Sequence, residues 1–119
     1  MFKKLILLSI LFSNLSFAKE DTIKEAIALK AIDDMCGDSW CEGDYNFEFN
    51  SLKCFENKNI CVLNFKMILD EVVFTQSCIL KNKKSHNDIL SVNGVKDNIY
   101  NELTECIEKI ESELHHNLF

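Results

Sequence analysis

The stretch YNFEFNSLKCFENKNICVLNFKMILDEVVFTQSCIL, residues 45–80, decides the fold of this chain. Apolar and polar side chains alternate along most of it, which is the period-two pattern of strands with one buried face. Two clusters of turn-forming residues, 56–59 and 70–71, interrupt the alternation. The pattern therefore predicts three consecutive antiparallel strands, joined by short turns.

The register of the first hairpin follows from arithmetic, because cross-strand partners in an antiparallel pair have residue numbers with a constant sum. Opposing Phe49 with Phe65 gives the sum 114. Buried residues should face buried residues, and the same register meets that condition with two further pairs, Phe47 with Met67 and Tyr45 with Leu69.

The cysteines of this hairpin are out of step with its aromatic residues by one. Cys54 and Cys61 have the sum 115. Both pairings hold if the first strand carries one extra residue, a β-bulge, near Ser51 and Leu52, where the alternation lapses. We therefore favour a Cys54–Cys61 disulfide.

The second hairpin supports a rival pairing. Opposing Phe65 with Phe74 gives the sum 139, and the same sum opposes Cys61 with Cys78. The sequence leaves Cys54–Cys61 and Cys61–Cys78 both open, with the former favoured.

Two segments with helical spacing flank the strands. Thr22, with Glu25 three residues later, forms a capping-box pattern at the start of the first segment, and Gly37 ends it. Its apolar positions are Ile23, Ile27, Ala31 and Met35. The second segment, from Val95 onward, carries the stripe Ile99, Leu103, Cys106, Ile110 and Leu114. This order predicts an α+β fold, a three-stranded antiparallel sheet flanked by an N-terminal and a C-terminal helix on its apolar face.

The first 18 residues have the features of a secretory signal peptide. Lys3 and Lys4 precede a short apolar run, 5–12, and small residues Ser16 and Ala18 precede a cleavage site after Ala18. The run is too short to span a bilayer, which needs about 20 residues. We expect a single small secreted domain, residues 19–119, that is periplasmic or extracellular and has no membrane anchor.

The charge of this domain is strongly negative. Loss of Lys3 and Lys4 leaves 11 lysines against 19 acidic residues, so the formal charge changes from −6 to −8, and the chain contains no arginine. Nucleic acid requires basic partners that this composition does not supply. Basic proteins or cations are the expected partners, and a protein is favoured.

All six cysteines fall within the predicted secreted domain, where an even number indicates disulfides that stabilise a small fold. Up to three bridges are expected, and 15 pairings are possible. The cysteines are Cys36, Cys41, Cys54, Cys61, Cys78 and Cys106.

The segment MCGDSWCEGDYNF, residues 35–47, is the most unusual in composition. Four residues separate Cys36 from Cys41, whereas thioredoxin-like redox sites have two, so we expect structural roles for both. They either close a local loop together or reach Cys78 and Cys106 through longer bridges.

Metal and catalytic chemistry receive little support. Zinc-type spacing is absent, and the acidic residues that begin at Asp38 miss the EF-hand pattern, with Phe49 where a glutamate belongs. Ser39 and His86 could serve a hydrolase, but no motif of fixed spacing supports one. We expect no cofactor or metal, and a calcium-stabilised module or a small hydrolase remains the alternative.

The loop residues are the best candidates for binding. A tryptophan in a disulfide-closed loop with carboxylates around it has the character of an interface anchor, although it could instead fold back against Tyr45 or Phe47. The candidate binding residues are Trp40, Asp38, Glu42, Asp44 and Tyr45. The sequence thus predicts a small secreted, non-enzymatic protein that binds a protein partner, as an inhibitor or an immunity-like antagonist does.

Overall fold

The computed structural model describes residues 21–118, so the predicted signal peptide lies outside the described residues. The elements are the N-terminal helix (described over 21–37), η1 (Trp40–Glu42), β1 (Asn46–Phe55), η2 (Glu56–Lys58), β2 (Ile60–Leu69), β3 (Val72–Lys81), η3 (His86–Asp88), β4 (Leu90–Ser91), β5 (Gly94–Val95) and α2 (Asp97–Leu118). The expected α+β class is confirmed. Besides the three-stranded sheet, the structure has a separate small sheet, the β4–β5 hairpin.

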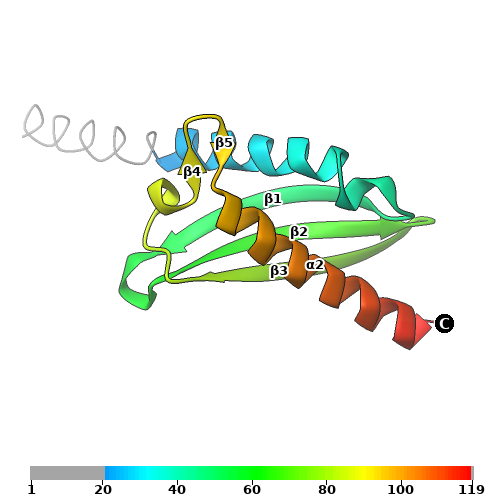
Figure 1. Cartoon of the computed structure of the whole chain (residues 1–119). Helices are drawn as coiled ribbons and strands as arrows, with labels where there is room; N and C mark the ends of the chain where they lie inside the picture. The colour runs from blue at the N-terminus through cyan, green and yellow to red at the C-terminus, as the bar shows by residue number, and fades with distance from the viewer. Residues whose placement is uncertain (1–20, 119) are drawn as a thin grey trace, which may run out of the picture.

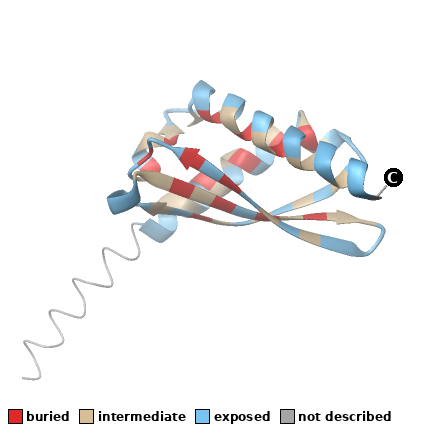
Figure 2. Ribbon diagram, turned by 90° about the horizontal axis from the view of Figure 1, so that it is seen from below, coloured by how far each residue is buried: buried red, intermediate tan, exposed pale blue. Residues whose placement is uncertain are grey.

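Both helices lie on the same face of the β1-β2-β3 sheet, as Figure 1 shows. The core forms between the helices and this face, and Figure 2 shows buried residues lining both sides of it. The fully buried side chains alternate along the strands, as in Leu63, Phe65 and Met67 of β2. Among residues 21–118, no helix lies on the opposite face of the sheet, which is typical of antiparallel sheets with one buried side.

The first hairpin has the register that the sequence predicts. Phe49 pairs with Phe65 and Phe47 with Met67, and the register then shifts by one between Phe49 and Ser51. The extra residue is Asn50, one position from where the lapse in alternation placed the bulge. Tyr45 precedes β1 and has no partner in this ladder.

The second hairpin has a register two residues away from the expected one, so the sum 139 is wrong. Leu69 pairs with Val72, which gives 141 throughout and leaves Asp70 and Glu71 as a two-residue turn. Both turn residues have positive φ, 48° and 72°, as type I′ turns require. A shift by two residues keeps every side chain on the same face of the sheet, so burial of the aromatic residues fits both registers. The geometry of the two-residue turn therefore selects the register.

This register decides between the two candidate partners of Cys61. Cys61 faces Leu80 rather than Cys78, which removes the rival pairing. The Cys54–Cys61 bridge closes the first hairpin, as favoured from the sequence. The other two bridges are Cys36–Cys41 and Cys78–Cys106, and no cysteine is free.

The N-terminal helix is rotated relative to the sequence prediction. Ala28, Ile32 and Cys36 are fully buried, whereas Ile23 and Ile27 remain about half exposed. Apolar residues occur on two faces of this helix, so periodicity alone did not select between them. The α2 stripe agrees better with the prediction, with Ile99 and Leu103 fully buried, although Ile107 rather than Cys106 lies at its centre.

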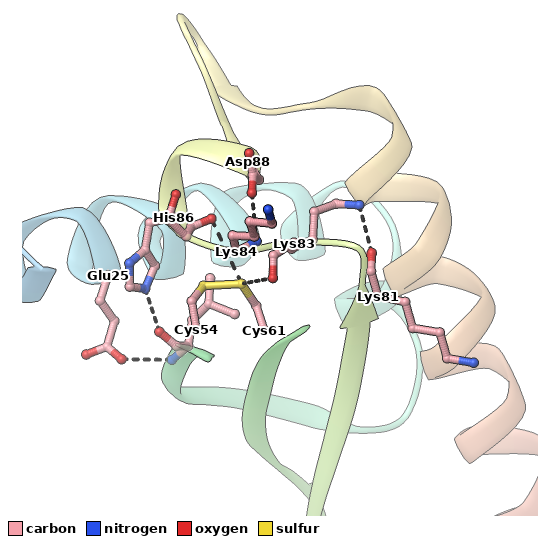
Figure 3. Close-up of a disulfide and its surroundings, with 10 residues drawn as sticks. Glu25, Cys54, Cys61, Lys81, Lys83, Lys84, His86 and Asp88 are labelled. Carbon is pink, nitrogen blue, oxygen red and sulfur yellow. Dashed lines mark hydrogen bonds between the residues drawn. A yellow bond between two sulfur atoms is a disulfide. The ribbon is translucent and has the colours of Figure 1, made fainter. Parts of the chain in front are cut away.

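Polar contacts fix the N-terminal helix to the end of the sheet near Cys54 and Cys61, drawn in Figure 3. Glu25 accepts the backbone N–H of Leu52 at 3.0 Å, and His86 Nε2 lies 2.7 Å from the Leu52 carbonyl oxygen, to which it donates. Glu25 also forms an ion pair with Lys53 at 3.0 Å. These contacts select the helix face that carries Glu25, and Ala28 and Ile32 lie on that same face.

We predict that Glu71→Gly raises the free energy of unfolding by about 0.5–1 kcal/mol. A glutamate at positive φ carries a steric cost of about 1–2 kcal/mol, which glycine removes while losing part of the gain to unfolded-state entropy. Urea denaturation of the oxidised protein measures the change. Glu71→Ala is the control, because it removes the charge and keeps the Cβ atom. Equal effects of the two variants would contradict the prediction.

Candidate acidic binding groove

A groove of about 790 Å³ lies between the C-terminal half of α2 and the end of the sheet that carries the β2–β3 turn. We call it the acidic groove. The segment before β1, the β2–β3 turn and α2 all contribute to its walls. Its lining residues are Gly43, Asp44, Tyr45, Leu69, Asp70, Glu108, Glu111, Ser112 and His115.

Local structure fixes each wall. Glu108 and Glu111 are three residues apart on α2, so they project from neighbouring positions of one flank. Asp70 is held by the two-residue turn between β2 and β3. The Tyr45 ring packs edge-on against Phe74, with centroids 6.4 Å apart, and this contact anchors the segment that carries Asp44.

The groove concentrates negative charge. Four of its lining residues are carboxylates, Asp44, Asp70, Glu108 and Glu111, and none is a lysine. Burial raises the pKa of the Glu111 carboxyl above its usual value, and the neighbouring Glu108 carboxylate raises it further. The free protein therefore disfavours the charged form of Glu111, which a bound cation would favour.

The structure places Trp40 inside the protein. Only 8% of its surface is exposed, its Nε1 donates to Thr104 Oγ1 at 3.0 Å, and its ring stacks on Tyr100 with centroids 5.8 Å apart. Trp40 thus folds back, but against α2 rather than against Tyr45 or Phe47. In this position it links the Cys36–Cys41 loop to α2 and does not project from the surface.

The other four candidate binding residues of the loop do not all lie at one site. Asp44 and Tyr45 both line the acidic groove. Asp38 lines a different groove, beside the β4–β5 hairpin, and Glu42 is exposed in η1. The structure therefore brings together two of the five candidate residues.

Sequence reasoning missed the other wall of the groove. The acidic residues of α2 are visible in the sequence as a polar face, but their spacing is also that of any solvated helix. Asp70 reads as a turn residue. Only the packing of α2 across the sheet brings Glu108, Glu111 and Asp70 near Asp44.

In the described part of the chain, no site is assembled for the hydrolase or the calcium alternative. Ser39 Oγ donates to the Met35 carbonyl at 2.7 Å, and His86 Nε2 donates to the Leu52 carbonyl. The two side chains are thus hydrogen-bonded to different backbone groups and not to each other. Within residues 21–118, no group of three or more His, Cys, Asp or Glu side chains is arranged to hold a metal ion. The calcium alternative thus has no ligand cluster there.

Comparison with protein-family models, with curated proteins and with solved structures finds no match for this chain. Among the helices described between residues 21 and 118, none is long and apolar enough to cross a membrane.

We predict that Glu111→Gln raises the melting temperature at pH 7. The folded-state pKa of Glu111 is raised, so its charged form destabilises the folded protein at neutral pH, and a neutral amide removes that penalty. As the pH falls through the folded pKa, the native carboxyl takes up a proton before the unfolded one does, so the wild type recovers stability. The advantage of the variant should vanish once both states are protonated.

Melting curves from pH 3 to pH 8 measure this difference. Glu105→Gln is the matched control, because Glu105 is an exposed residue of the same helix outside the groove lining. A difference between Glu111→Gln and wild type that grows on acidification would contradict the assignment.

Proposed function

We propose that this chain is a small secreted, non-enzymatic binding protein that holds a basic segment of a partner protein in the acidic groove, in the manner of an inhibitor or an immunity-like antagonist. The observation that carries the proposal is the convergence of four carboxylates on one groove whose lining has no lysine. Such a groove concentrates negative potential and attracts a complementary positive surface.

The groove offers a basic side chain more than charge. The aromatic ring of Tyr45 stands among the carboxylates, and an ammonium or guanidinium group gains from contact with both. Leu69 adds an apolar surface for the aliphatic stem of lysine or arginine. Burial and then the neighbouring Glu108 carboxylate raise the pKa of Glu111, and a cation bound beside it would favour its charged form.

Export is supported by two independent features. The sequence begins with the pattern of a signal peptide, and all six cysteines are paired in three disulfides. Disulfides persist in oxidising compartments, where small domains use them to supplement a limited core. In this proposal, the role of Trp40 is structural. Its hydrogen bond with Thr104 holds in place the loop that leads to Asp44.

We predict that a hexalysine peptide binds the oxidised protein at the acidic groove. Nuclear magnetic resonance titration should shift the signals of Asp44, Tyr45, Glu108 and Glu111 first. The double substitution Glu108→Gln and Glu111→Gln should weaken binding by about tenfold or more, consistent with about 0.7 kcal/mol or more for each charge removed. Raising the salt concentration should weaken binding to the wild type.

The matched control is the double substitution Glu105→Gln and Glu113→Gln, which removes two exposed charges from the same helix outside the groove lining. Partners captured from envelope extracts or culture medium and identified by mass spectrometry should show the same preference. Equal loss of binding in both double variants would mean that binding depends on the overall negative charge of the protein and not on the acidic groove, which would contradict the proposed site.

A further inference from the structure

The surface around the β4–β5 hairpin exposes apolar side chains that are not buried in the core. Val92, at the tip of the hairpin, is 98% exposed. On the N-terminal helix, Ile23 and Ile27 are 49% and 52% exposed, because the helix turns a different apolar face toward the core. Ile27 shares a groove with Asn93 of the hairpin, so helix and hairpin form one surface.

The hairpin is a rigid support for Val92. Its base is anchored by Ile89, which is fully buried and accepts the Lys96 N–H at 2.9 Å. Gly94, with φ of 140°, lies against the helix, where an added Cβ would come 3.9 Å from the Cβ of Ala31. Figure 1 shows the hairpin rising beside the helix, with its turn directed away from the sheet.

Valine is a poor choice for this turn. Residues 92–93 connect the paired Ser91 and Gly94, and tight turns favour Gly, Asn, Asp and Ser over β-branched residues. A side chain that is 98% exposed contributes almost no burial to folding. Where a sequence departs from local rules without a gain in stability, a functional contact is the usual reason.

A groove of about 450 Å³ lies directly beside this projecting tip. We call it the finger groove. One wall is the helix, the other is the hairpin, and its apolar surface comes from Ile27, Ala31, Met35 and Val95. Its rim carries both signs of charge, with Lys30 and Asp34 paired at 3.5 Å and Asp38 nearby.

We propose that a second copy of this chain docks here, with Val92 of each copy inserted into the finger groove of the other. An interface about a twofold axis must be complementary to itself, and a ridge beside a groove on one face meets that condition. Each contact covers Ile27 and Val92 together and leaves no apolar tip in water. The mixed rim of the finger groove selects no charged partner, in contrast to the acidic groove.

The dimer and the proposed basic partner should respond to salt in opposite directions. Two copies of a chain with a net negative charge repel each other, so salt should strengthen the dimer. Binding of a basic segment to the acidic groove should weaken under the same change. The two proposals can therefore fail independently.

Sedimentation equilibrium of oxidised protein, residues 19–119, from 10 μM to 1 mM tests the interface. We expect a monomer–dimer equilibrium whose dissociation constant rises at least tenfold in Val92→Lys and in Ile27→Asp. Val72→Lys is the matched control, because Val72 is 53% exposed and lies outside the finger groove lining, and it should leave the constant unchanged. Circular dichroism melting curves verify that each variant folds.

Mixing the two impaired variants gives the decisive result. In a heterodimer of Val92→Lys with Ile27→Asp, one contact is entirely wild type, and the other joins the introduced lysine to the introduced aspartate. We expect the heterodimer to form more tightly than either variant alone. A wild-type monomer at 1 mM, equal effects at Val72 and Val92, or no recovery in the mixture would each overturn the proposal.

Discussion

The attachment of α2 to the sheet is the constraint on which the rest of the structure depends. The Cys78–Cys106 disulfide joins the buried face of β3 to the middle of α2, and its 28-residue separation makes it the longest loop closed by a bridge in this chain. In the chain-entropy model such a closure stabilises the folded state by about 3–4 kcal/mol. The Lys83–Glu102 ion pair, at 3.4 Å, and the Trp40–Thr104 hydrogen bond hold the first half of α2 on two sides. Without this attachment the acidic groove would lose one wall.

The acidic groove shows a conflict between stability and the arrangement of charge. Burial, and then the like charge of Glu108, raise the pKa of the Glu111 carboxyl, so the charged form of Glu111 destabilises the free protein. The mature charge of −8 expected from the sequence adds to this repulsion over the whole molecule. The disulfides and the closely packed inner face of the sheet compensate for it. A protein that needed only to remain soluble could distribute these carboxylates over its surface without that cost.

Much of the fold was predictable from the sequence, because its decisive features are local. A bulge near Ser51 and Leu52 and the Cys54–Cys61 bridge followed from period-two alternation along one hairpin, and the structure has the bulge one residue earlier, at Asn50. The second register was missed because aromatic pairing was given more weight than the two-residue turn after Leu69. The rotation of the N-terminal helix was missed because this helix is apolar on two faces. Of the acidic groove, only Asp44 and Tyr45 stood out in the sequence, since Glu108 and Glu111 join them through packing between distant segments.

The clamp on Leu52 has a consequence for the outer margin of the sheet. β1 is a terminal strand, and the N–H and C=O of Leu52 point away from β2, toward the place where a further strand could add. Glu25 and His86 occupy both groups, while the bulge at Asn50 interrupts the regular spacing a few residues earlier. Exposed strand margins are templates for amyloid-type stacking, and natural proteins block them with such devices. One glutamate and one histidine therefore take up the two backbone groups of Leu52 through which a further strand would pair with β1.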